Sequence, residues 1–309
     1  YGVTAGVDAT TGPLSQGIAM AVGIAMAEKH LAAVYNKPGY PVIDHYTYTL
    51  LGDGDLMEGL SEEAINIAGQ HHLGKLIALY DSNDVSLDGP LSFSTSEDVK
   101  QRLEAAGWDY QIVKDGNNDL AGIQAALENA KASDKPSIIE VKTTIGIGTK
   151  EAGTNKIHGA ALTDDQVAQL RDYYQWNYAP FVFPESVYET FDKAVDQKIS
   201  NYDQWQSMMK NYQTNYPVEY RQLYSDHLDT EGVSTHYQPG DEVATRNVCA
   251  EVLAELAKKN PQLWTGAADL FASTKTNLKD TDRFSATNPA GRNVYFGVRE
   301  FGMAAATNG

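Results

Sequence analysis

The chain has 309 residues, which is enough for one large domain or two ordinary ones. Its 41 acidic residues outnumber the 24 basic ones, and the net charge of -17 disfavours binding to nucleic acids and to anionic membranes. The single Cys249 excludes an intramolecular disulfide, and no run of about 18 apolar residues indicates a membrane span. We therefore expect a cytoplasmic protein that binds neither nucleic acid nor membrane.

The first half of the chain alternates between helical and strand patterns. In chain order, the apolar periodicity predicts a helix over 12–35, a strand over 46–51, a helix over 58–72 and a strand over 75–80. Helices over 97–106 and 120–132 follow, and then a third strand over 137–142. This alternation is typical of a parallel sheet flanked by helices, so we predict an α/β domain over residues 1–160.

The remainder of the chain has a different character. Residues 161–239 are rich in Tyr, Gln and Asp, show few strand signals and contain a helical stretch over 185–209. We interpret them as a helical connection. A helical pattern over 241–258 and a short strand around 263–265 predict that residues 240–309 begin a second, similar α/β domain, which is truncated.

The two ends of the chain also carry information. The sequence opens at Tyr1 without a Met or a signal-peptide pattern, and it stops at Gly309 just after the apolar run 296–306. A helix with an apolar face needs partners for that face, and natural domains seldom end inside one. We expect further sequence on both sides.

Polar residues follow the first two predicted strands at the points where they end. Gly52-Asp53-Gly54 follows the first, and Asp81-Ser82-Asn83 follows the second. Ligands of parallel sheets bind at the carboxyl ends of strands, where Asp53 and Asn83 would supply oxygen ligands suited to Mg²⁺ or Ca²⁺. Such a metal could bridge to a diphosphate, and the glycines would let the backbone approach it closely. Alternatively, the Gly-Asp-Gly sequence is an ordinary turn and Asn83 an ordinary strand-end residue.

The spacing of these residues resembles a known family pattern. Gly-Asp-Gly followed by Asn, 83 − 53 = 30 residues later, resembles the thiamine diphosphate-binding motif. Further segments resemble the transketolase family in order and separation: Thr10 to Gly17, Leu51 to Gly59, Ile157 to Ala160, and Gly297 to Glu300. The resemblance covers nearly the whole chain and implies the thiamine diphosphate-binding fold.

The resemblance implies a role for each matching residue. Asp53, Asn83 and the main-chain carbonyl of Val85 would bind the metal, and Gly54 and Asn83 would contact the cofactor's diphosphate. The cofactor would be lined by Gly12, Pro13 and Leu14.

The resemblance also assigns the catalytic and substrate residues. His158 would lie beside the diphosphate and the reacting carbonyl carbon. Glu300 would hydrogen-bond the cofactor's aminopyrimidine ring and promote removal of the proton from its thiazolium carbon. Glu58 resembles an acid that links the two cofactor sites of a dimer, while Arg246 and Ser273 match positions that hold the sugar phosphate.

Chemistry supports these roles independently. Splitting a ketose beside its carbonyl requires an electron-sink cofactor, and a guanidinium such as that of Arg246 matches a phosphate. Glu300 requires an apolar pocket, which we expect from the neighbouring Phe296, Val298, Phe301 and Met303.

Each of these residues also has a purely structural interpretation. Glu300 could pair with Arg299 on a helix surface, His158 could be a loop residue, and Arg246 could be solvated. We interpret the remaining histidines as structural or surface residues and Cys249 as a core residue.

The favoured hypothesis is transketolase, which transfers a two-carbon ketol unit between sugar phosphates in the pentose phosphate pathway. Its active site would lie at the subunit interface of a homodimer. Two sister activities on the same scaffold, dihydroxyacetone synthase and deoxyxylulose phosphate synthase, are alternatives, as are a non-catalytic homologue and a half-subunit that needs a partner chain. Phe301-Gly302 stands where many relatives have His-Ala, which bears on packing near the cofactor.

Overall fold

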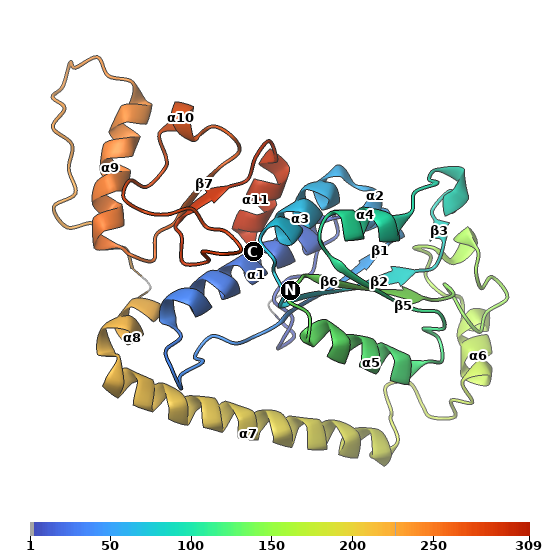
Figure 1. The fold of residues 1–309 in the computed structure, drawn as a ribbon. Helices are drawn as coiled ribbons and strands as arrows, with labels where there is room; N and C mark the ends of the chain where they lie inside the picture. The colour runs from blue at the N-terminus through green and yellow to red at the C-terminus, as the bar shows by residue number, and fades with distance from the viewer. Residues whose placement is uncertain (1–2, 226) are drawn as a thin grey trace.

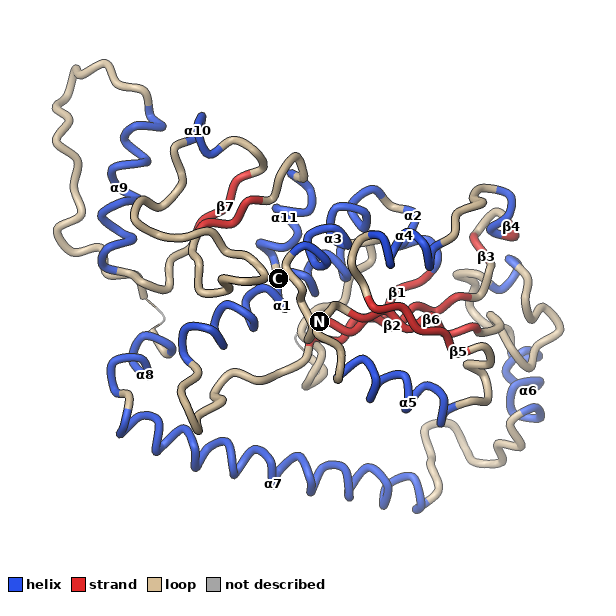
Figure 2. Tube along the Cα trace, in the orientation of Figure 1, coloured by secondary structure: helices blue, strands red, loops and turns tan. Residues whose placement is uncertain are grey.

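The computed structural model describes residues 3–225 and 227–309, which are arranged around one parallel sheet (Figures 1 and 2). The sheet has the strand order β1-β2-β6-β5, and every neighbouring pair is parallel. Its strands are β1 (Thr47–Gly52), β2 (Leu76–Ser82), β5 (Asp109–Val113) and β6 (Ser137–Lys142). The predicted α/β architecture is confirmed.

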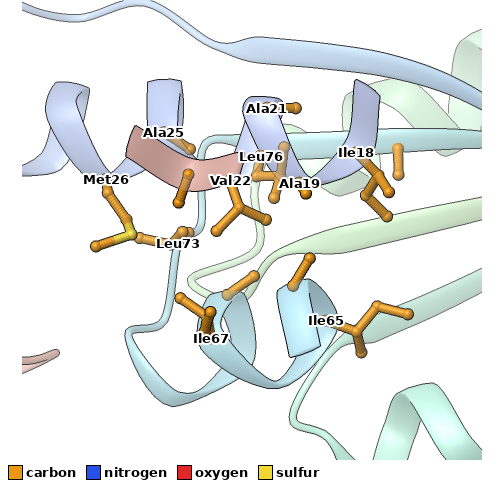
Figure 3. Close-up of a cluster of buried hydrophobic side chains, with 14 of the residues drawn as sticks. Ile18, Ala19, Ala21, Val22, Ala25, Met26, Ile65, Ile67, Leu73 and Leu76 are labelled. Carbon is orange, nitrogen blue, oxygen red and sulfur yellow. The ribbon is translucent and has the colours of Figure 1, made fainter. Parts of the chain in front are cut away.

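One face of the sheet is covered by helices that pack around a central helix, α1 (Gln16–Tyr35). It contacts β1, α3 (Gly59–Gln70) and α11 (Glu300–Asn308). Its side chains meet those of α3 and β2 in a core that Figure 3 shows, including Ile18, Val22, Ile65, Ile67 and Leu76, all at most 2% exposed. Near that core lie two short helices, α2 (Asp53–Met57) and α4 (Val99–Ala105).

The opposite face of the sheet is covered by α5 (Leu120–Lys131). Ala126 and Ala130 of this helix pack against Ile77, Ile139 and Val141 of the two central strands. Since both faces of β2 and β6 are covered, nearly all of their residues are at least partly buried, including the apolar run 76–80 of β2 and Ile138, Ile139 and Val141 of β6.

By length and composition, α1 could cross a membrane, and it is the one helix of the described residues that could. Such a helix was not predicted, because the sequence has no uninterrupted run of about 18 apolar residues. Half of its most apolar window is buried inside the protein. It therefore serves as the central helix of the fold.

A hairpin and a long helical segment follow the sheet strands. The hairpin consists of β3 (Val85–Ser86) and β4 (Gly89–Pro90), followed by the 3-10 turn Leu91–Phe93. After β6, a second 3-10 turn (Asn155–Ile157) precedes α6 (Asp164–Tyr173), α7 (Glu185–Asn215) and α8 (Pro217–Leu223).

The carboxyl half of α7 forms hydrogen bonds with the end of α1 and with the loop that follows α1. The Tyr212 hydroxyl donates to the Tyr35 carbonyl at 2.7 Å, and the Trp205 indole N–H donates to the Val42 carbonyl at 3.1 Å. This helix continues past the predicted end at residue 209, and Figure 1 shows it running along the outside of the molecule.

The last part of the chain contributes a small two-stranded sheet. The elements are α9 (Thr245–Lys259), β7 (Thr265–Ala267), α10 (Phe271–Thr274) and β8 (Asn293–Tyr295), with β7 and β8 parallel. Phe284, Val294 and Phe296 from this part join the same buried cluster as α1 and α3. The last part of the chain therefore shares one core with α1 and α3.

Two strands were not predicted from the sequence, and one prediction about a side chain is wrong. The strand β5 was not predicted, because this edge strand contains Gln111 and the exposed Ile112 and so lacks a continuous apolar run. The three-residue β8 was too short to leave a pattern. Cys249 is exposed, so the prediction that it is a core residue is wrong: α9 has no buried residue at all.

We predict that Gly69→Ala destabilises the fold. A Cβ at Gly69 would lie 1.7 Å from the main-chain oxygen of Ala106, so α3 would have to move away from the end of α4. Overpacking of this kind lowers the free energy of unfolding by about 1–3 kcal/mol. Denaturant unfolding measures it, with Gly59→Ala as the control, because a Cβ at Gly59 in the same helix meets nothing within 4 Å. Equal stability of the two variants would contradict the packing described.

We predict that His71 makes the protein sensitive to acid. Burial, with the charges of Lys29 and Arg283, lowers the pKa of His71 from 6.5 to about 4. Because the unfolded chain binds this proton more tightly, stability is lost as the pH falls from about 6.5 towards 4, by up to about 3 kcal/mol. Unfolding curves at several pH values should show a shallower loss for His71→Leu, whereas His72→Leu, at an exposed neighbour, should follow the wild type.

Candidate active site

Asp53 lies at the centre of the predicted site, on the first residue of α2 directly after β1. Its side chain is only 6% exposed. Oδ2 accepts the main-chain N–H groups of Asn83 at 3.3 Å and Asp84 at 3.2 Å, and Oδ1 accepts the hydroxyl of Tyr80. The ends of β1 and β2 therefore bring Asp53 and Asn83 together, as their places after neighbouring parallel strands predict.

The carboxylate of Asp53 is buried without a cationic partner. Among residues 3–225 and 227–309, no Lys or Arg forms an ion pair with it; the nearby Lys142 pairs with Glu140 at 3.0 Å and Asp84 at 3.6 Å. Burial raises the pKa of Asp53, and the hydrogen bonds from Tyr80 and the main chain offset only part of that effect. A buried carboxylate of this kind would be stabilised by a bound cation.

Tyr80 connects Asp53 to a buried polar cluster beneath it. Burial and the hydrogen bond to Asp53 raise the pKa of Tyr80, so its hydroxyl remains a donor. On the neighbouring β6, Glu140 accepts hydrogen bonds from Ser82 at 2.9 Å, from Lys142 and from Tyr110. Burial alone would raise the pKa of Glu140, but these bonds outweigh it and the pKa is lowered. These hydrogen bonds therefore fix the side chains that lie next to Asp53.

Asn83 and Val85 lie beside Asp53 on the other side of the turn. The Asn83 side-chain oxygen accepts the N–H of Val85 at 3.1 Å and retains a second lone pair. Val85 is paired with Pro90, which has no N–H to donate to the Val85 carbonyl. The three predicted metal ligands are thus close together, and their oxygens suit Mg²⁺ or Ca²⁺.

The ligand set is nevertheless incomplete on its own. Within the described part of the chain, no group of three or more His, Cys, Asp or Glu could hold a metal ion. The predicted set has one carboxylate, one amide and one main-chain carbonyl, so phosphate oxygens and water would have to supply the remaining positions. The donor chemistry fits a metal that is bound jointly with a diphosphate.

Gly54 faces the loop that contains Gly12, Pro13 and Leu14. A Cβ at Gly54 would lie 3.3 Å from Leu14 Cδ1, and a Cβ at Gly12 would meet nothing within 4 Å. Gly12, Pro13 and Leu14 are all exposed, Leu14 to 50%. The two predicted cofactor segments are therefore side by side and accessible.

His158 follows the 3-10 turn Asn155–Ile157 and is half-buried. The Asn155 side chain donates to the Leu87 carbonyl at 3.0 Å, which ties this turn to the β3–β4 hairpin. The Nδ1 atom of His158 is buried and has no hydrogen-bond partner among the described residues. An unpartnered buried ring nitrogen at this place is compatible with a role toward a ligand.

A pocket of about 450 Å³ also borders Asp53, but it is not the predicted diphosphate site. Its lining includes Asp84, Glu97 and Glu140 but none of Gly54, Asn83 and His158. The several carboxylates in its wall disfavour a diphosphate.

Two predicted acids lie on the surface of the described chain. Glu58 is exposed at the end of α2, and Glu300 is exposed at the first turn of α11. The predicted apolar pocket around Glu300 is absent from the described residues, because Val298 is 74% and Phe301 73% exposed, although Phe296 is buried. Within one chain these residues therefore do not form the expected pocket, and the role of Glu300 stays a prediction. Nor does an ion pair join Glu300 to Arg299, whose side chain donates to the Phe296 carbonyl.

Arg246 and Ser273 lie on the two helices at the other end of the molecule. Both are exposed, and the bond from Lys275 Nζ to the Asn247 side chain at 2.6 Å holds α9 and α10 next to each other. Figure 1 shows α9 and α10 on the far side of α1 and α11 from α2 and β3. Within one chain, the predicted sugar-phosphate residues are thus separated from the predicted metal site.

Family models match nearly the whole chain. Residues 1–231 match the thiamine diphosphate binding domain of transketolase, and residues 241–309 match its pyrimidine binding domain. The chain belongs to the transketolase family.

Transketolases of known sequence and structure agree with this assignment. The transketolase of Halalkalibacterium halodurans is 49% identical over 100% of this chain and 47% of its own length, and that of Bacillus subtilis is 48% identical over 100% and 48%. The solved transketolase from Leishmania mexicana has a TM-score of 0.94 at 38% identity, over 98% of this chain and 46% of its own. This chain spans about half the length of the curated transketolases it matches. The predicted domain boundaries at residues 160 and 239 remain predictions.

The transketolase pattern did not single out Tyr80 and Asp55 as site residues. Both make side-chain contacts that only the folded chain reveals, Tyr80 to Asp53 and Asp55 to two main-chain groups. The one available signal was position, since Tyr80 is the residue before the polar end of a strand.

We predict that Tyr80→Phe weakens metal binding at Asp53. Removing the hydroxyl leaves Oδ1 without the group that orients it, and loss of such an outer contact raises the Kd for a metal roughly tenfold or more. Calorimetric titration with Mg²⁺ in the presence of thiamine diphosphate measures this Kd. Tyr48→Phe, at a half-exposed tyrosine of β1, is the control and should bind as the wild type does. Wild-type affinity in Tyr80→Phe would refute the orienting role.

Proposed function

We propose that the protein is a transketolase that uses thiamine diphosphate and Mg²⁺ or Ca²⁺ to move a two-carbon ketol unit from a ketose phosphate to an aldose phosphate. The observation that carries the proposal is the buried carboxylate of Asp53, which accepts the main-chain N–H of Asn83 and forms no ion pair with a Lys or Arg of the described residues. The family models supply the cofactor class, since the first describes a thiamine diphosphate binding domain.

In this proposal, the residues of the first domain bind the metal and orient the cofactor. Asp53, Asn83 and the Val85 carbonyl would hold the metal, and Gly54 and His158 are the residues that we propose for contact with the diphosphate. Thiamine diphosphate, when bound, stabilises the negative charge left as the ketose is split beside its carbonyl. The protein's part would be to bind and orient that cofactor, with the metal neutralising the negative charge of its phosphates and of Asp53.

Glu300 is the proton-handling residue of the proposal. Its carboxylate would hydrogen-bond the aminopyrimidine ring and shift a proton there, a role that requires exclusion of water. In the described chain Glu300 is exposed, and its sequence neighbours Val298 and Phe301 are exposed apolar residues. We propose that a second subunit covers these side chains and excludes water from Glu300.

A homodimer would bring the two halves of the site together. Arg246 and Ser273 lie on elements far from α2 in one chain, and Glu300 lacks an apolar cover, so both features favour a site formed between two subunits. Glu58, exposed at the end of α2, would link the two sites of such a dimer.

Sugar phosphates are the proposed substrates. Transketolases of Pichia stipitis similar to this chain were solved as complexes with fructose 6-phosphate and sedoheptulose 7-phosphate. Arg246 supplies a planar donor set for such a phosphate, and Ser273 supplies a hydroxyl. We place the reaction in the pentose phosphate pathway of the cytoplasm.

Titration of the intact native protein with thiamine diphosphate and Mg²⁺ tests the proposal. We predict that the wild type binds the cofactor in a metal-dependent manner and that Asp53→Ala loses this binding. Glu300→Gln should keep the affinity within a few-fold but lose ketol transfer by roughly 100-fold or more, because an amide cannot shift the proton.

The outcomes separate the parts of the proposal. No binding by the wild type would refute the thiamine assignment altogether. Full ketol transfer by Glu300→Gln would refute only the role of Glu300. An exposed glutamate distant from the site, Glu189→Gln on α7, is the matched control and should change neither quantity.

A further inference from the structure

Asp55 joins the two chain segments that line the proposed cofactor site. Its Oδ1 accepts the main-chain N–H of Ser15 at 2.7 Å, and its Oδ2 accepts the main-chain N–H of Gly52 at 2.8 Å. Ser15 ends the loop that contains Gly12, Pro13 and Leu14, whereas Gly52 begins the Gly-Asp-Gly turn. The carboxylate of Asp55 thus connects its own turn to Ser15, 40 residues earlier in the sequence.

The N–H of Ser15 is presented by an unusual backbone conformation. Ser15 has φ 68°, in the left-handed region that residues other than glycine rarely adopt, and it is only 2% exposed. Its side chain does not cap α1 but donates to the Leu14 carbonyl. The surrounding contacts must therefore hold Ser15 in place, and the bond to Asp55 is the one that comes from the opposite cofactor segment.

The bond between Asp55 and Ser15 lies next to a close contact between Leu14 and Gly54. Leu14, directly before Ser15, packs where a Cβ at Gly54 would be only 3.3 Å from its Cδ1. Asp55 directly follows Gly54. A movement of Ser15 away from Asp55 would carry Leu14 away from Gly54 and change the space between the two segments.

We propose that Asp55 is a positioning residue that holds the Gly12–Leu14 loop against Gly54 and thereby sets the affinity for a diphosphate cofactor. This inference rests on the proposed function. Asp55 itself touches neither the metal ligands nor the cofactor in the proposal. It acts through the two main-chain groups that it accepts.

The chemistry of the bridge requires a carboxylate. Both partners of Asp55 are donors, so both side-chain oxygens must accept. An amide in its place offers one acceptor and one NH₂ group, which would face an N–H group without a bond. Asp55→Asn therefore removes one of the two connections at nearly constant size.

The test measures the affinity of the intact native protein for thiamine diphosphate at saturating Mg²⁺, together with amide hydrogen exchange at Gly12, Leu14, Ser15 and Gln16. We expect Asp55→Asn to raise the Kd roughly tenfold or more and to speed exchange at Ser15, because hydrogen bonds to charged groups are among the stronger ones. The Kd for Mg²⁺ should stay within a few-fold. Asp8→Asn, at an exposed aspartate close to the same loop, should behave as the wild type.

Each result has one meaning. A wild type that does not bind thiamine diphosphate refutes the proposed function and, with it, the cofactor role of Asp55. Wild-type binding with an unchanged Kd in Asp55→Asn refutes the role of Asp55 alone, even if exchange at Ser15 quickens. If Asp55→Asn does not fold, Asp55→Ser, which keeps one oxygen acceptor in a smaller side chain, is measured with the same criteria.

Discussion

Parallel pairing of β1 with β2 is the constraint on which the site depends. Gly52 lies opposite Asp81, so β1 and β2 end at the same edge of the sheet. The turns that follow the two strands are therefore neighbours at that edge. Asp53 can then accept two main-chain N–H groups of the turn after β2. A shift of this register by one residue would turn Tyr80 to the other face of the sheet, because side chains alternate along a strand.

Much of the fold could be predicted from the sequence because its central strands are covered on both sides. β2 begins with the apolar run 76–80, and β6 contains three buried apolar residues, Ile138, Ile139 and Val141, which mark both strands. β5 lies at the edge of the sheet, where Gln111 and the exposed Ile112 interrupt the run. A strand as short as β8 depends on tertiary contacts, among them the buried Asn293 side chain that bonds to the Leu278 carbonyl at 3.0 Å.

The site was predictable where it follows from strand ends and unpredictable where it follows from side-chain contacts. The proximity of Asp53 and Asn83 needs only two neighbouring parallel strands. The bonds of Tyr80 and Asp55 require the particular directions of those side chains in the folded chain. Burial around Glu300 depends on what covers the surface of α11, and local sequence does not specify that cover.

Because the two matched domains share one core, cleavage of the chain between them should not separate them. Phe284, Val294 and Phe296 pack in one cluster with residues of α1 and α3, and a Cβ at Gly23 of α1 would lie 2.0 Å from the Ala306 carbonyl oxygen. A proteolytic nick between α8 and α9 would break the covalent link but leave these contacts intact. The two pieces would stay associated, since each alone would expose the apolar surface that the other covers.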